Sequence, residues 1–114
     1  MIIKFKKTQN ILIAAIEGEI DHHSAETILR ELDNRFSESG AKNLIFDFKG
    51  LKFMDSSGLG IIIGRYKTVS ALGGRTGICA PTDSVKRLLT LAGIHKIIPL
   101  FSSIDDAVDE MKNA

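Results

Sequence analysis

Residues 52–61 decide the fold, and they read Lys52-Phe53-Met54-Asp55-Ser56-Ser57-Gly58-Leu59-Gly60-Ile61. This cluster of small and polar residues separates two apolar runs. The run before it, 44–48, is short, continuous and bounded by Gly50, which predicts a buried strand. In the run after it, the apolar residues recur at helical spacing, as Leu59, Ile62, Ile63, Tyr66 and Val69. The cluster is therefore predicted to form a loop that leaves a strand and enters a helix.

The rest of the chain continues this alternation of extended and helical patterns. Short apolar runs between turn residues predict further strands at 2–5, 11–17, 77–80 and 96–100. Apolar stripes predict helices at 24–39, from 57 to the Gly73-Gly74 pair, at 85–92 and from 103 onward. Such alternation produces a largely parallel sheet covered by helices. We therefore expect the α/β class, with a mixed, mostly parallel sheet of four to five strands packed by about four helices.

Composition restricts the kind of protein this can be. The chain has 114 residues and no linker or repeat, so we expect a single domain over residues 1–114. A formal net charge of +1 gives no reason to expect nucleic acid as a partner. No apolar run approaches the roughly 20 residues of a membrane span, and the N-terminus lacks a signal-peptide core. The single cysteine, Cys79, excludes an internal disulfide and fits a reducing compartment. We expect a cytoplasmic protein without stable membrane association.

The place of the cluster in such a fold indicates a functional role. In open parallel sheets, binding sites gather beyond the carboxyl ends of the strands. The 52–57 segment leaves the strand at 44–48 and therefore lies at that edge. Asp21 lies at the same edge if the strand at 11–17 runs parallel to its neighbours. We therefore expect Asp21 to lie close to the loop that contains Ser57.

Capping alone does not account for the cluster. Ser56 or Ser57 can cap the following helix, because a hydroxyl accepts a hydrogen bond from a free N–H of the first turn. Each of Gly58 and Gly60 costs a helix about 1 kcal/mol relative to alanine, which suggests a surface kept clear for a partner. A serine at a helix N-terminus also suits phosphorylation, since the free amides and the helix dipole there favour an anion. Asp55 opposes a phosphate by like-charge repulsion.

Enzymatic motifs fit the sequence less well. A nucleophile elbow needs glycine two residues before the serine, and Asp55 stands there before Ser57. The dinucleotide-binding fingerprint fails at Ile63, and the chain has no Gly-Lys-Ser/Thr. A Ser-His pair would depend on the fold to bring up one of three histidines, His22, His23 or His95. A small hydrolytic or nucleotide-binding protein remains the minor alternative.

The adjacent His22 and His23 do not predict a metal site. Neighbouring residues do not share a helix face, and no cysteine pair or nearby third histidine completes a ligand set. The simpler interpretation is a helix start capped by Asp21 or Ser24. Cys79 is interpreted as a small buried hydrophobe. We expect no metal and no cofactor.

Two long motifs carry a family resemblance. They are Gly18-Glu19-Ile20-Asp21-His22-His23-Ser24-Ala25-Glu26-Thr27 and Phe53-Met54-Asp55-Ser56-Ser57-Gly58-Leu59-Gly60-Ile61-Ile62-Ile63-Gly64-Arg65-Tyr66-Lys67. In these motifs, and in 85–88 and 93–98, the chain resembles the anti-anti-sigma factors of the STAS domain family. The resemblance covers nearly the whole chain. The Asp-His-His run and the double serine favour the sporulation branch over the general-stress branch, many of whose members carry Ser-Thr at 56 and 57.

The resemblance implies a regulatory protein with no catalytic residues of its own. Its partner would be an anti-sigma factor that is also a serine protein kinase. The unphosphorylated chain would bind this kinase in its nucleotide-bound form and release the sporulation sigma factor, sigma-F. Phosphorylation of Ser57, the second serine of Asp-Ser-Ser-Gly, would end binding, and a PP2C-type membrane phosphatase would restore it. The alternative is a general-stress sigma-factor antagonist of the same family.

The resemblance also implies which residues contact the partner. In the family, the Asp of the Gly-Glu-x-Asp motif lies near the phosphorylated serine, which implies a contact role for Asp21. The full expected set is Asp21, Asp55, Ser56, Ser57, Gly58, Leu59 and Gly60.

Overall fold

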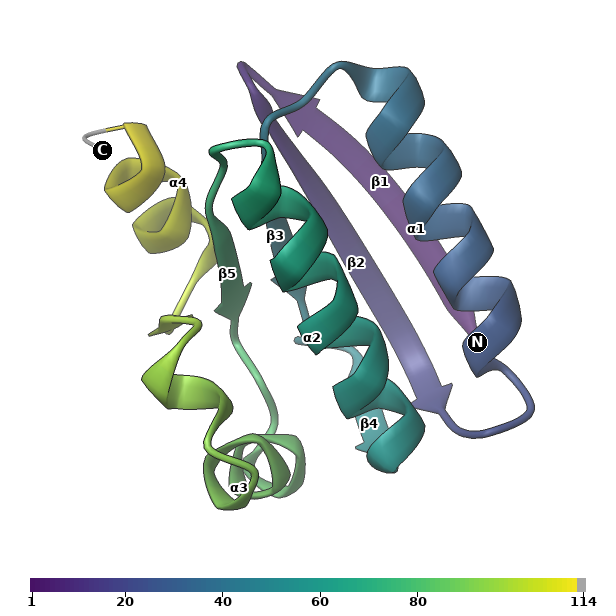
Figure 1. The fold of residues 1–114 in the computed structure, drawn as a ribbon. Coiled ribbons are helices and arrows are strands. Elements are labelled where there is room, and N and C mark those ends of the chain that lie inside the picture. Colours follow the sequence, from purple (N-terminus) through teal and green to yellow (C-terminus); the bar gives the residue numbers. More distant parts are fainter. Residues whose placement is uncertain (113–114) are drawn as a thin grey trace.

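Strands and helices alternate along the chain in the computed structural model, which describes residues 1–112 (Figure 1). Within that range the strands are β1 (Ile2–Thr8), β2 (Ile11–Ile20), β3 (Asn43–Asp47), β4 (Leu51–Met54), β5 (Thr76–Cys79) and β6 (Leu100–Phe101). The helices are α1 (Ala25–Ser39), α2 (Ser56–Ala71), α3 (Asp83–Leu91) and α4 (Ile104–Lys112), with a short 3₁₀ helix η1 (Ile94–Lys96). The expected α/β class is confirmed.

The sheet is mixed and mostly parallel, as expected. Its main path runs β1-β2-β3-β5-β6, with β1 antiparallel to β2 and the later pairs parallel. The long β2 serves two neighbours in succession. Its first half pairs with β3, and its end pairs in parallel with β4, with a register shift between Gly18 and Glu19. Because β2 continues past β3, its last residues reach the segment that leads into α2.

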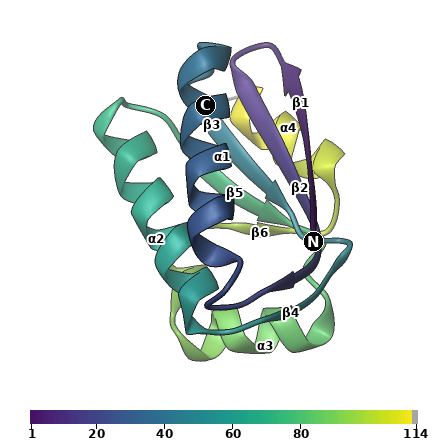
Figure 2. The same ribbon diagram turned by 90° about the vertical axis from the view of Figure 1, so that its right-hand side faces the viewer.

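Helices cover both faces of the sheet (Figures 1 and 2). α1 and α2 lie side by side on one face, and their apolar residues join the larger core, which includes Ile28, Leu32 and Ile62. α4 covers the other face, where Ala107 and Met111 pack in a smaller core. The alternation of side chains along β2 supplies both cores, since successive residues of a strand point to opposite faces. The packed sheet thus holds the ends of β2 and β4 and the starts of α1 and α2 in fixed positions relative to one common core.

The prediction of a loop at 52–57 is wrong for the first half of that segment, which forms the end of β4. The strand is short, and only its end residues Leu51 and Met54 are buried, while Phe53 is 49% exposed. This pattern has no period of two, so the sequence did not reveal it. Side chains preceding and within α3 hydrogen-bond to β4: Thr82 Oγ1 donates to the Leu51 carbonyl at 3.2 Å and Ser84 Oγ to the Lys52 carbonyl at 3.4 Å. With β4, the described sheet has one strand more than the four to five expected.

The strand predicted at 96–100 is also mostly wrong. Residues Ile94–Lys96 form the η1 turn, and the strand β6 is only Leu100–Phe101. Ile94 and Ile98 are both buried, and a helical turn places residues four apart on the same side. The apolar run therefore packs as a turn over the core before the chain rejoins the sheet.

Candidate functional site

The ends of β2 and β4 bring the two sequence motifs together. Ile20 and Met54 are partners in the parallel pairing, and the Asp55 amide donates to the Ile20 carbonyl at 3.1 Å. Asp21 and Asp55 each follow these partners directly. The expectation that Asp21 lies close to the segment containing Ser57 is therefore confirmed. Both carboxylates lie at the carboxyl edge of parallel strands, where sites in such sheets gather.

Asp55, rather than either serine, caps α2. Its backbone is extended, and its Oδ1 accepts a hydrogen bond from the Ser57 amide at 2.8 Å. Aspartate is as good an N-cap as serine, so the helix begins one residue earlier than predicted, at Ser56. The cap therefore does not depend on the hydroxyl of Ser56 or Ser57, which leaves both free for modification chemistry.

The sequence predicts that the amides at the start of α2 are free to bind an anion, and the capping carboxylate shows that this expectation is wrong for the Ser57 amide. The Ser57 amide is bound to Asp55 Oδ1, and the Gly58 amide donates to the Asp55 carbonyl at 3.0 Å. A fixed negative charge thus already complements the helix dipole there. A phosphate on Ser57 would lie beside this carboxylate instead of in an empty anion site.

Ser57 borders a shallow hollow between α1 and α2. The hollow has a volume of about 310 Å³, and its lining includes Ala25, Glu26, Leu29 and Ile61. Ser57 is half-buried at this border, whereas Ser56 is exposed to solvent. A phosphate on the second serine would thus lie at the edge of the recess between the two helices.

The surroundings of the two glycines in the cluster, Gly58 and Gly60, differ. Gly58 is buried, and a Cβ there would overlap Cγ and Sδ of Met54 and lie 3.4 Å from Ile20 Cγ2. Internal packing of α2 on β2 and β4 therefore gives a reason for this glycine that does not involve a partner. Gly60 is exposed, and a Cβ there would meet no atom within 4 Å. Gly60 remains compatible with clearance for a partner.

Asp21 and Ser24 form a reciprocal pair before α1. The Ser24 amide donates to Asp21 Oδ1 at 2.9 Å, and the Asp21 amide donates to Ser24 Oγ at 3.0 Å. The expected cap takes a different form: Ser24 is the N-cap residue of α1 but makes no side-chain hydrogen bond to the first turn, and the Asp21–Ser24 pair closes the turn before the helix instead. The hydrogen bond from the Ser24 amide is the largest cause that lowers the pKa of Asp21 below its ordinary value. Asp21 accordingly presents a carboxylate that remains ionised beside Asp55.

The two histidines beside Asp21 lie at the protein surface. His22 and His23 are exposed, with their rings edge to face and 6.0 Å between centroids. Within residues 1–112, no cluster of three or more histidine, cysteine or acidic side chains is arranged to hold a metal ion. Over the same residues, no helix combines the length and apolarity needed to cross a bilayer.

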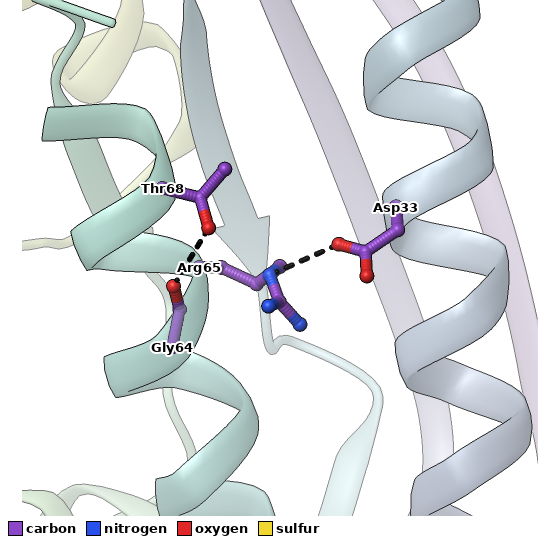
Figure 3. A network of polar contacts seen from close by, with 4 residues as sticks. All are labelled: Asp33, Gly64, Arg65 and Thr68. Carbon is purple, nitrogen blue, oxygen red and sulfur yellow. Dashed lines mark hydrogen bonds and ion pairs between the residues drawn. The ribbon is translucent and has the colours of Figure 1, made fainter. Parts of the chain in front are cut away.

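Sequence reasoning missed Arg65 and Asp33, which connect the two helices beside the site. Arg65 Nε lies 3.1 Å from Asp33 Oδ1, as Figure 3 shows. Arg65 also lines the hollow at Ser57. Its position one helical turn beyond Ile61 was the available signal, since that spacing directs it to the same side of α2.

Comparison with known proteins identifies the class. The STAS domain family matches residues 3–107. The unphosphorylated form of the anti-sigma factor antagonist SpoIIAA superimposes with a TM-score of 0.86 at 24% identity, over 99% of this chain and 98% of that one, which is evidence of a shared fold. An anti-sigma F factor antagonist of Paenibacillus polymyxa is 34% identical over 96% of this chain and 94% of its own length. An anti-sigma-B factor antagonist of Bacillus subtilis is 32% identical over 93% of this chain and 95% of its own length. The chain therefore belongs to the STAS domain family and, within it, to the anti-sigma factor antagonists.

Proposed function

We propose that the unphosphorylated protein binds an anti-sigma factor that is also a serine kinase, and that this binding releases the sporulation sigma factor sigma-F. Phosphorylation of Ser57 by that kinase switches the protein off. The observation that carries the proposal is the position of Ser57: it lies in the first turn of α2, its hydroxyl is not needed for the cap, and it borders a recess next to the Asp21 loop. Similarity to the sigma F antagonist of Paenibacillus polymyxa supports the choice of sigma factor.

The proposed contact surface consists of Asp21, Asp55, Ser56, Ser57, Gly58, Leu59 and Gly60. Ser56 and Gly60 are exposed, and Asp21 and Asp55 are partly exposed. Gly58 acts indirectly, because its missing side chain lets α2 lie close to Met54. The surface thus joins the first turn of α2 to the loop before α1.

Phosphate would act on this surface without unfolding it. A phosphoserine adds about −1.5 to −2 charge. The backbone amide of Ser57 cannot stabilise this charge, because it already donates to Asp55 Oδ1. Glu26 adds a second acid in the lining of the same hollow. The acids on both sides push the phosphate outward, where it blocks the partner by bulk and by repulsion. A like-charge contact in an interface costs several kcal/mol, which lowers the affinity by about 100-fold or more.

The direct experiment mixes the protein with purified anti-sigma F factor and ATP. Mass spectrometry should locate the added phosphate on Ser57, and the complex should dissociate as it appears. Ser57→Ala should bind the ADP-bound kinase but stay bound when ATP is added. Ser56→Ala is the matched control and should be phosphorylated and released like the wild type. Phosphate on Ser56 would contradict the assignment.

The second candidate is a general-stress antagonist, which the similarity to the Bacillus subtilis sigma-B relative supports. The chemistry is the same, and only the partner differs. Parallel titrations against anti-sigma F and anti-sigma B factors separate the two, and we expect the tighter binding to the former.

The remaining parts of the cycle are proposed on the same basis. A PP2C-type phosphatase at the membrane removes the phosphate, while the protein itself works in the cytoplasm without stable membrane association or nucleic-acid contact. It turns over no substrate of its own. ATP hydrolysis by the purified protein alone would contradict this and favour the enzymatic alternative.

A further inference from the structure

A groove extends between α1 and α2 well beyond the proposed contact surface. The hollow at Ser57 forms its first part. A second hollow of about 500 Å³ lies further along both helices, with Phe36, Thr68 and Leu72 in its lining. Arg65 lines both hollows, so they adjoin at this residue. The Arg65–Asp33 ion pair joins α2 to α1 at this point, and the two hollows on either side of it form a groove that follows α2 from its first turn to its end.

Arg65 lies at the centre of this groove with hydrogen-bonding capacity left over. Its side chain is only 15% exposed, and Asp33 approaches Nε at 3.1 Å (Figure 3). Even so, in the part of the chain that the structure describes, Nε and Nη1 are buried without an acceptor in hydrogen-bond geometry. Buried donors without acceptors are unfavourable and uncommon in folded proteins. The Asp33 carboxylate compensates the charge at Nε, so the donor that an oxygen brought in from outside would satisfy is Nη1.

The α2 side of the groove has no side chain at two successive positions, Gly60 and Gly64. Gly60, Gly64 and Thr68 follow one another at four-residue spacing and so lie on one face of the helix. A Cβ at Gly60 or Gly64 would meet no atom within 4 Å. Glycine inside a helix lowers its stability, and here no internal packing requires it. These two glycines instead leave room for something that approaches α2 from outside.

We propose that the groove receives a helix of the anti-sigma factor kinase, a proposal that rests on the proposed function. Apolar side chains of that helix fill the two hollows, and an uncharged oxygen, from a backbone carbonyl or an amide side chain, accepts from Arg65. A carboxylate is disfavoured there because Glu26 and Asp33 already line the groove. From Ser57 to Leu72 the groove spans about 22 Å at 1.5 Å per residue, the length of a four-turn helix.

A helix in the groove would also be sensitive to phosphate on Ser57. Ser57 borders the first hollow, where Ala25, Leu29 and Ile61 offer apolar surface. A phosphate at that border would have to lose its water when an apolar side chain enters the hollow, which is strongly unfavourable for a charged group. Modification at one end of the groove thus opposes docking along its length.

Titration calorimetry with the ADP-bound kinase tests the groove. Gly64→Gln places a long side chain in the open space on the α2 side of the groove. Because it blocks a central contact, it should weaken binding by about tenfold or more. Because glutamine favours helix and the space is open, the Tm should not fall. Ser70→Gln adds the same side chain to an exposed position of α2 that is not on the face shared by Gly60, Gly64 and Thr68, and should bind like the wild type. Arg65→Met keeps the apolar bulk, removes the donors, and should also weaken binding about tenfold.

The outcomes separate the groove from the proposed function. Wild-type affinity in both Gly64→Gln and Arg65→Met, with phosphate on Ser57 still releasing the kinase, overturns the groove and leaves the proposed function standing. A fall in the Tm of Gly64→Gln contradicts the open space on which the groove depends. Failure of the wild-type protein to bind the kinase overturns the proposed function, and the groove with it.

Discussion

At the scale of single residues, Asp55 has the most consequential position in the site. It ends the β4 segment, caps α2 through the Ser57 amide at 2.8 Å, and follows directly the residue paired with Ile20. The same carboxylate occupies the place at the helix N-terminus that a phosphate on Ser57 would otherwise take. One residue therefore sets both the start of α2 and the electrostatic surroundings of Ser57.

Asp55→Ala should lower the free energy of unfolding by about 1 kcal/mol, the usual effect of losing an N-cap. Asp55→Asn should retain most of the stability, because asparagine caps as well as aspartate. Urea denaturation of the two variants and the wild type measures the difference. Equal losses in both would show that charge, and not the cap hydrogen bond, is what Asp55 contributes.

Asp21 gives a pH-dependent prediction. Its pKa is lowered from the ordinary value of 3.8, chiefly by the hydrogen bond from the Ser24 amide. A depressed pKa in the folded state contributes stability that is fully present above 3.8 and is lost as the pH falls through the lowered pKa. Asp21→Asn should therefore be less stable than the wild type near neutral pH, and the difference should disappear in acid. Denaturation of both proteins across that range is the measurement, and a pH-independent difference would contradict the assignment.

At the scale of elements, the periodic helices were predictable and the short strands were not. The stripe that predicted 24–39 matches α1 at Ala25–Ser39, and Gly40 ends the helix with φ 71° as expected of glycine. β4 escaped notice because four residues with two exposed in the middle show no alternation. The neighbourhood of Asp21 and the Ser57 segment was predictable from parallel topology. The Arg65–Asp33 ion pair was not predictable, because it depends on how α1 lies against α2.

The pairing of β3 with β5 yields a prediction about Cys79. The thiol is fully buried opposite Asp47 in the register, and burial, reinforced by the Asp47 charge, raises its pKa to about 12. The thiolate is the reactive form, so Cys79 should react with a thiol reagent at neutral pH only when the protein unfolds. Labelling rates in buffer and in urea provide the test. Rapid labelling of the folded protein would mean that the smaller core under α4 opens readily.

At the scale of the whole molecule, Ser57 lies apart from the two hydrophobic cores that hold the fold together. The larger core joins α1, α2 and α3 to the sheet, and the smaller core joins α4 to its other face. Ser57 borders a surface hollow and is absent from both cores. Phosphorylation should therefore change the surface and leave the backbone in place. Amide chemical shifts should change near residues 21–26 and 54–61 and stay constant elsewhere, whereas changes across the sheet would indicate a rearrangement.

The central claim is that a phosphate on Ser57 abolishes partner binding by altering one surface. Its most direct test is the affinity of the protein for ADP-bound anti-sigma F factor, measured by titration calorimetry with and without stoichiometric phosphate on Ser57. The account predicts that the phosphorylated protein binds about 100-fold more weakly, or not measurably, while keeping the same fold. Equal affinities for the two forms would contradict it.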